Sequence, residues 1–90
     1  VINTVVIYEN ESSQFSVYPN PFKDQLIIEG LLLNGAATVK IYSSEGKLIR
    51  VQENVTIESN EINDLGGLAA GHYIVEISQG TFTEKYRLIK

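Results

Sequence analysis

The sequence offers few residues that could carry out catalysis. It contains one histidine, His72, and no cysteine, so a thiol nucleophile, a disulfide and a thiolate metal site are all impossible. A serine hydrolase would have to use His72 as its base, yet no Gly-x-Ser-x-Gly elbow or other nucleophile signature accompanies it. A transition-metal site would need a second histidine or a cysteine. We therefore expect an exposed, idle His72, no cofactor and no enzymatic activity.

Calcium and carbohydrate are the two remaining kinds of ligand to consider. Four carboxylates fall on predicted turns, at Asp24, Glu45, Glu61 and Asp64, but no Asp-x-Asp-x-Asp-Gly spacing gathers them. We interpret them as solvated turn residues and expect no bound metal. A carbohydrate platform would need a row of exposed aromatic side chains, and the sequence has no tryptophan. Tyr42, which is predicted to face outward, keeps this platform as a minor alternative.

Length and charge limit the classes of protein to which the chain can belong. Ninety residues, of which 43% are hydrophobic and 20% charged, are typical of a single globular domain. No apolar run approaches the roughly 18 residues of a membrane span, and a net charge of −4 argues against nucleic acid as a partner. All eleven acids precede Lys85, whereas the last six residues hold three of the seven cations. The chain opens on Val1 without an initiator methionine or signal peptide, so we expect a piece of a longer protein.

A period of two residues predicts an all-β fold. Alternating segments recur along the chain between turn signals about every 8–12 residues, as in a β-sandwich. Seven strands are predicted, over residues 15–18, 25–29, 37–42, 47–52, 55–62, 72–77 and 82–89. The side chains predicted to face inward in the second, third, fourth and sixth strands are Leu26, Ile28, Ala37, Val39, Ile41, Ile49, Val51, Tyr73, Val75 and Ile77. This pattern predicts a seven-stranded, immunoglobulin-like Greek-key β-sandwich over residues 14–90.

Two segments of this scheme leave alternatives open. Residues 1–13 are predicted to be a linker or the tail of a preceding domain, although the β-branched residues 1–9 could instead add an edge strand. The loop after the second strand contains three consecutive leucines, Leu31, Leu32 and Leu33. They either cover the open end of the core or form an exposed apolar patch.

The segment before the sixth strand predicts a tyrosine corner. Leu65 and Leu68 lie three residues apart in a short glycine-containing turn, and Gly71 supplies the positive φ that swings the chain into the strand. In such a corner the tyrosine ring packs inward while its hydroxyl reaches back to the backbone upstream. We therefore expect a buried Tyr73 whose hydroxyl bonds to the backbone between about Leu65 and Ala69.

The last predicted strand is the basic part of the sequence. Phe82, Tyr86 and Leu88 share one parity and are predicted to face the core, which leaves Lys85 and Arg87 side by side on the outer face. Lys90 then continues the positive charge beyond the strand. One interpretation is a solvated cationic edge that discourages strand-to-strand aggregation. The other interpretation is a recognition surface.

Four segments, taken in order, resemble one family. Residues 17–22 resemble its opening Tyr-Pro-Asn-Pro motif, and residues 24–28 its following Asp-x-Leu-x-Ile. Residues 39–42 with Gly46 and Lys47 are similar to its central hairpin. Residues 65–77 are similar to its Asp-Leu-x-x-Leu-x-x-Gly-x-Tyr signature, and residues 85–90 to its basic end. The motif residues in this sequence are Tyr18, Pro19, Asn20, Pro21, Leu65, Leu68, Gly71 and Tyr73. Over about residues 15–90 the chain thus resembles the C-terminal sorting domain of type IX secretion cargo, the type A (Por secretion) family of Gram-negative bacteria.

The resemblance implies a function that composition alone does not. It implies an immunoglobulin-like domain at the C-terminus of a larger exported protein, which acts as an address read by the outer-membrane translocon. Independently of the resemblance, we expect the domain to be a monomer. A surface sortase would then remove the domain and join the cargo to anionic lipopolysaccharide, so the protein would pass through the periplasm to the cell surface or the medium. The residues placed in translocon recognition are Lys85, Arg87, Ile89 and Lys90. The alternative is a fibronectin-like binding or spacer module of a secreted multidomain protein, for carbohydrate or for adhesion.

Overall fold

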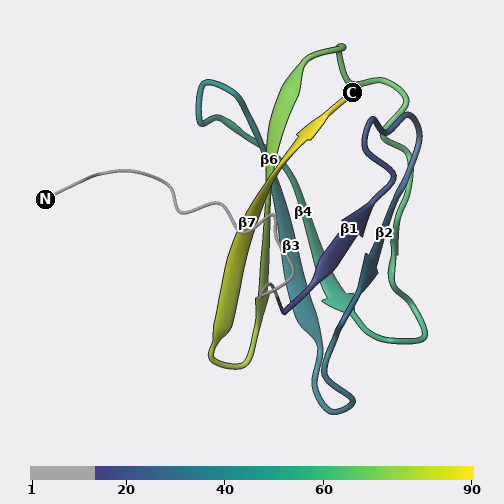
Figure 1. Ribbon diagram of the computed structural model, residues 1–90, viewed down its shortest axis with the longest axis vertical. Helices are drawn as coiled ribbons and strands as arrows, with labels where there is room; N and C mark the ends of the chain where they lie inside the picture. Colours follow the sequence, from purple (N-terminus) through teal and green to yellow (C-terminus); the bar gives the residue numbers. More distant parts are fainter. Residues whose placement is uncertain (1–13) are drawn as a thin grey trace, which may run out of the picture.

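The computed structural model describes residues 14–90 as seven antiparallel strands in two packed sheets (Figure 1). The strands are β1 (Ser16–Tyr18), β2 (Leu26–Glu29), β3 (Ala37–Ser43), β4 (Leu48–Val55), β5 (Glu61–Ile62), β6 (His72–Gln79) and β7 (Phe82–Ile89). One sheet has the order β1-β2-β5 and the other the order β4-β3-β6-β7. The predicted all-β, seven-stranded sandwich is confirmed. The predictions for residues 1–13 lie outside the described residues.

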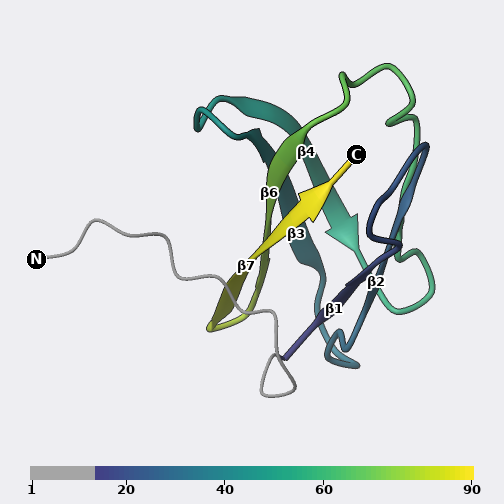
Figure 2. The ribbon, with the colours of Figure 1, turned by 45° about the horizontal axis from the view of Figure 1, so that its top comes forward.

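The chain crosses between the two sheets in a Greek-key path, which Figures 1 and 2 show from two sides. It leaves the smaller sheet after β2, forms the β3–β4 hairpin in the larger sheet, and returns so that β5 pairs with β2. It then crosses again, so that β6 pairs with β3 and is followed by β7. The path places β6 at the centre of the larger sheet, as predicted from its alternating sequence.

The core lies between the inner faces of the two sheets. Along β6, Tyr73, Val75 and Ile77 are buried, and Leu26 and Ile28 of β2 are fully buried opposite them. Their parity was predicted correctly, because side chains two residues apart along a strand lie on the same face. The core therefore rests on β6 and the short strands that cover it.

The three leucines after β2 divide between the two predicted roles. Leu31 belongs to the core, whereas Leu33 is 84% exposed. The buried side chain of Gln79 holds this loop, because its Oε1 accepts a hydrogen bond from the Leu32 amide at 2.6 Å and its Nε2 donates to the Gly35 carbonyl at 3.2 Å. A buried polar side chain thus satisfies backbone groups that the loop would otherwise leave unpaired.

The prediction that Ile49 and Val51 of β4 belong to the core is wrong. These side chains are 36% and 41% exposed, and the inward positions opposite Ile41 and Val39 are occupied by Arg50 and Gln52. The larger sheet is one strand wider than the smaller one, and β4 is its edge. The inner side of β4 can therefore carry polar groups, and the Arg50 guanidinium donates to the Asn63 carbonyl beside the smaller sheet at 2.8 Å.

The predicted edge strand over residues 55–62 is also mostly wrong. β4 continues to Val55, and Thr56 and Ser59 then exchange two backbone hydrogen bonds, both of 3.1 Å, that close a turn. Only Glu61–Ile62 pairs with β2, as the two-residue strand β5. Ile62 is nevertheless fully buried, so the short strand still contributes to the core.

Candidate functional site

The Tyr-Pro-Asn-Pro segment lies against the end of β7. The Asn20 Oδ1 atom accepts a hydrogen bond from the Ile89 amide at 3.0 Å, and the Phe22 amide donates to the Ile89 carbonyl at 2.9 Å. Phe22 is buried, and its ring meets the Tyr73 ring edge to face with centroids 5.9 Å apart. Both backbone groups of Ile89 are therefore satisfied by residues about 70 positions earlier in the sequence.

The predicted tyrosine corner is confirmed. Tyr73 is 7% exposed, and its hydroxyl donates to the Ala69 carbonyl at 2.5 Å. The Leu68 amide donates to the Leu65 carbonyl at 3.1 Å, which closes the predicted turn, and Leu65 is buried. Gly71 has a φ of +149°, a conformation that side chains disfavour, and from it the chain enters β6.

These segments meet at one end of the sandwich, near the C-terminus in Figure 1. Residues 19–22, 65–73 and 89–90 are hereafter called the motif end. Gly71 and Lys90 exchange two backbone hydrogen bonds, of 3.0 and 2.8 Å, and the Lys90 ammonium donates to the Gly66 carbonyl at 3.4 Å. The structure thus places Lys90 in the motif end, apart from the other cations of the last strand.

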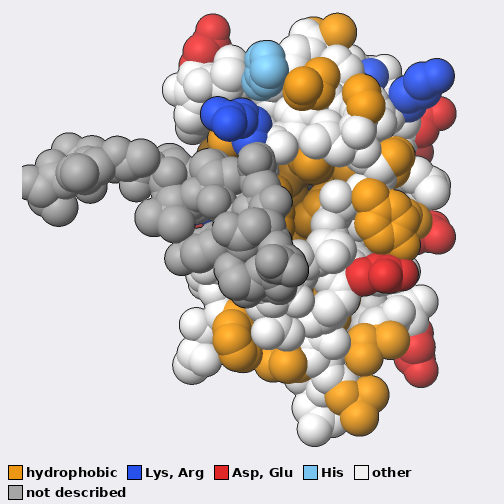
Figure 3. Space-filling model, viewed as in Figure 1, with side chains coloured by type: hydrophobic (Ala, Val, Ile, Leu, Met, Phe, Trp, Pro, Cys, Tyr) orange, Lys and Arg blue, Asp and Glu red, His pale blue; other side chains and the backbone are white. Residues whose placement is uncertain are grey.

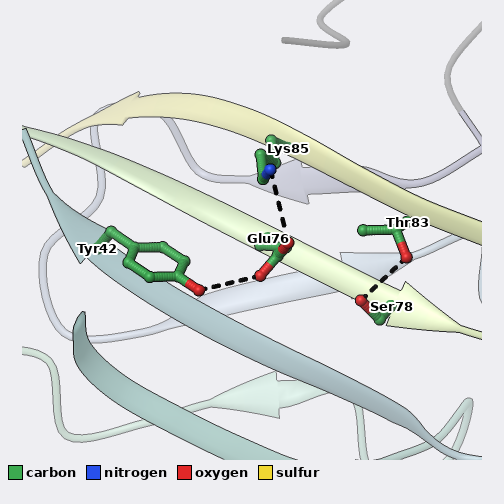
Figure 4. A network of polar contacts seen from close by, with 5 residues as sticks. All are labelled: Tyr42, Glu76, Ser78, Thr83 and Lys85. Carbon is green, nitrogen blue, oxygen red and sulfur yellow. Dashed lines mark hydrogen bonds and ion pairs between the residues drawn. The ribbon is translucent and has the colours of Figure 1, made fainter. Parts of the chain in front are cut away.

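The outer face of the larger sheet carries the other two cations of β7. Tyr86 and Leu88 are buried and Arg87 is exposed, as their parity predicted, while Lys85 is half-buried and points outward (Figure 4). The prediction is wrong for Phe82, which is 39% exposed beside the hairpin turn, where it pairs with Gln79. The outer face is defined here by its outward side chains on the four strands, namely Thr38, Lys40, Tyr42, Leu48, Val51, Ile74, Glu76, Ser78, Thr83, Lys85 and Arg87.

A polar network crosses the middle of this outer face (Figure 4). The Lys85 ammonium lies 3.7 Å from a Glu76 carboxylate oxygen, and the Tyr42 hydroxyl donates to the other oxygen at 3.1 Å. Lys40 is the register neighbour of Glu76 on the opposite side from Lys85. Burial raises the pKa of Tyr42, and the hydrogen bond to Glu76 raises it further. The glutamate thus lies between two cationic neighbours and a neutral phenol.

The two sheets differ in the charge of their strands. β1, β2 and β5 contain no lysine or arginine, and they carry Glu29 and Glu61. The exposed Tyr18 hydroxyl donates to Glu29 at 2.8 Å, a bond that raises the pKa of Tyr18. Lys40, Lys85 and Arg87, by contrast, all lie on the outer face of the larger sheet, so this face is the cationic side of a protein with a net charge of −4.

A shallow groove joins the outer face to the motif end. It is lined by Asn20, Ser44, His72, Tyr73, Ile74, Arg87 and Ile89. Figure 3 shows the single histidine beside hydrophobic side chains at this end of the molecule. Polar, cationic and apolar groups therefore lie next to one another, which is the mixture found at protein-binding surfaces.

Comparison with known families decides which family this arrangement belongs to. The chain matches the family model of the secretion system C-terminal sorting domain over residues 16–90. The chain belongs to this family. A comparison with curated proteins gives no match. The sorting domain is thus a C-terminal sorting signal of the type IX (Por) secretion system. Its family consists of sorting signals and is not a family of enzymes. Membership in this family implies a secreted protein that interacts with the type IX machinery.

The described part of the sorting domain contains neither a cluster of metal ligands nor a membrane-spanning helix. Among residues 14–90, no three histidine, aspartate or glutamate side chains gather as a metal would require, and the single histidine, His72, is exposed. No helix among these residues is long and apolar enough to cross a membrane.

Sequence reasoning missed several partners in the sorting domain. Tyr42 was predicted to face outward, and Glu76 alternates with the inward residues Val75 and Ile77, but nothing in the sequence indicated that the two side chains meet. Gln79 continues the inward parity of β6, and a polar residue at an inward position was a signal for a buried hydrogen-bonding role. The partners of Asn20 and Glu84 lie about 70 residues away, and no local pattern identifies them.

Proposed function

We propose that the sorting domain directs a larger cargo protein through the outer membrane by way of the type IX translocon, and that it has no catalytic activity of its own. The observation that carries this proposal is the family match over residues 16–90. Its motif residues supply the contacts that hold the end of β7. The unit that carries the address spans residues 14–90, because the amides of Gln14 and Phe15 are already bonded to β7.

The surface proposed for translocon recognition is the outer side of β7, with Lys85, Arg87 and Ile89. Lys90 supports it from the motif end by fixing the last residues to Gly71. Ile89 is 44% exposed and lines the groove next to Arg87. Because this side of an acidic domain is cationic, the matching partner is a protein surface with acidic side chains around an apolar centre.

Processing after export is the finer part of the proposal. A surface sortase would cut the chain N-terminal to the sandwich and attach the cargo to anionic lipopolysaccharide. The support is the family resemblance, and the sorting domain itself need not bind the lipopolysaccharide. In this scheme the domain passes through the periplasm with its cargo and is absent from the attached product.

The experiment that tests the proposal is export of a periplasmic reporter fused to the chain in a type IX-competent host. The fusion should reach the surface or the medium, while the reporter alone stays in the periplasm. In the same host without a working translocon, the fusion should also stay in the periplasm. Retention of the fusion in the competent host, with the sandwich shown to be folded, would contradict the proposal.

A further inference from the structure

The first described residues of the sandwich are bonded to its last strand. The Gln14 amide donates to both carboxylate oxygens of Glu84 at 3.0 Å. The Phe15 amide donates to the Tyr86 hydroxyl at 3.2 Å, and that hydroxyl lies 2.8 Å from the Phe15 carbonyl oxygen. The Tyr86 hydroxyl is also within hydrogen-bond reach of the Glu84 carboxylate, so its proton can serve either acceptor. Glu84 and Tyr86 together are hereafter called the latch.

The opposite side of Gln14 is held by the loop after β2. The Gln14 side-chain amide donates to the Gly30 carbonyl at 3.0 Å. Gly30 has a φ of +89°, and a Cβ atom at this position would collide with the Gln14 carbonyl oxygen. Phe15, the next residue, is 2% exposed and belongs to the core. The chain therefore becomes part of the sandwich at Gln14, where contacts from two sides hold it.

A protease needs a segment of backbone that is accessible and free of internal hydrogen bonds. The latch removes both properties from Gln14 and Phe15. We propose that Glu84 and Tyr86 set the boundary between the sorting domain and the segment that precedes it, so that a cut that separates the two from the folded protein falls N-terminal to Gln14. This inference goes beyond the export function, because it concerns any enzyme that hydrolyses the chain.

The latch and the proposed recognition surface lie on opposite sides of the same strand. Lys85 and Arg87 point to the outer face, while Glu84 and Tyr86 alternate with them and face the start of the sandwich. A partner bound to the outer face would therefore leave the latch closed. Loss of β7 from the sandwich would open it, so the boundary lasts only as long as the last strand is docked.

The test combines limited proteolysis of the 90-residue chain with amide hydrogen exchange. Under native conditions a protease of broad specificity should leave a stable fragment that begins at or before Gln14, as read by mass spectrometry. In Glu84→Ala, cleavage between residues 14 and 16 and exchange of the Gln14 amide should both accelerate at least about tenfold, because a hydrogen bond to a charged group is lost. Glu53→Ala removes an exposed carboxylate from β4 and is the matched control, with no expected change.

Exchange of the buried Val75 amide separates local opening of the latch from global unfolding. If Glu84→Ala destabilises the whole sandwich, Tyr86→Phe keeps the ring in the core and should still accelerate exchange at Phe15 relative to Val75. Rapid cleavage of the wild-type chain between residues 14 and 16 would overturn the proposal. The proposal would also be overturned if, in both variants, the exchange rates of the Gln14 and Phe15 amides relative to Val75 stayed within twofold of the wild-type values.

Discussion

The motif end and the outer face use their residues in opposite ways. In the motif end, Phe22, Leu65 and Tyr73 are buried, and Asn20 satisfies a backbone group of another segment. On the outer face, polar side chains such as Glu76 and Lys85 bond mainly to one another and keep part of their surface in water. The comparison teaches that the family motif describes how β7 is held. The surface proposed for a partner is the outer side of β7, which adds Lys85 and Arg87 and shares the exposed Ile89 with the motif end.

The largest expected effect comes from the core of the motif end. Phe22→Ala removes a buried ring that packs against Tyr73, and we expect it to lower the free energy of unfolding by about 3–5 kcal/mol. Export should fall because the sandwich unfolds. Chemical denaturation measures the change, and Leu33→Ala, at a side chain that is 84% exposed, is the control with an expected change within about 0.5 kcal/mol. Equal stability of the two variants would contradict the claim that the buried residues of the motif end hold the fold together.

The loss of a single hydroxyl should affect stability more in the motif end than on the outer face. Tyr73→Phe deletes the hydrogen bond to the Ala69 carbonyl and should cost about 1 kcal/mol of unfolding free energy. Tyr42→Phe deletes a hydrogen bond on the outer face, where water can replace the hydroxyl at Glu76, so it should cost less. Thermal unfolding of the two variants side by side checks the order. A larger loss in the Tyr42 variant would mean that the outer-face network stabilises the fold.

The smallest effect is a dependence on alkaline pH. The pKa of Tyr42 is raised above 10.0 by burial and by the Glu76 hydrogen bond, so the folded state favours the neutral phenol. This contribution to stability is present below the unfolded pKa and is lost as the pH rises through the higher folded pKa. The phenolate absorbance of wild type minus that of Tyr42→Phe should therefore titrate above pH 10.0. Glu76→Gln should lower the pKa of Tyr42 only in part, because the burial of the phenol remains. A Tyr42 pKa at or below 10.0 in the wild type would contradict the hydrogen bond between Tyr42 and Glu76.

The sequence predicted those parts of the fold that depend on local chemistry. The corner around Tyr73 follows from a turn and an alternating strand that are adjacent in the chain, so its buried ring and its bond to Ala69 could be foreseen. In β4, apolar Ile49 and Val51 alternate with Arg50 and Gln52, and alternation alone predicts two faces but not which one turns inward. The register pairs Arg50 with Ile41 and Gln52 with Val39, so the apolar side of β4 faces water.

Long-range contacts of the candidate site could not be foreseen from local patterns. Asn20 was assigned to a motif, but its role as the acceptor for the Ile89 amide depends on a segment 69 residues away. The same holds for Glu84, because nothing in the sequence indicates that its partner is the Gln14 amide, 70 residues earlier. A turn or a strand is specified by neighbours in sequence, whereas these contacts depend on how the sheets pack.

The central claim is that the outer side of β7 is read during export while the motif end keeps that strand in place. Deleting residues 85–90 would not test it, because Tyr86 and Leu88 would leave the core. The direct measurement is export of the reporter fused to a Lys85→Gln, Arg87→Gln double variant. The control is a Lys23→Gln, Lys47→Gln double variant, which has the same change of charge at exposed positions outside the outer face. Both variants should keep their unfolding free energy within about 1 kcal/mol of wild type, because surface charges contribute little. We predict that the first variant stays in the periplasm and the second is exported, and efficient export of the first would contradict the claim.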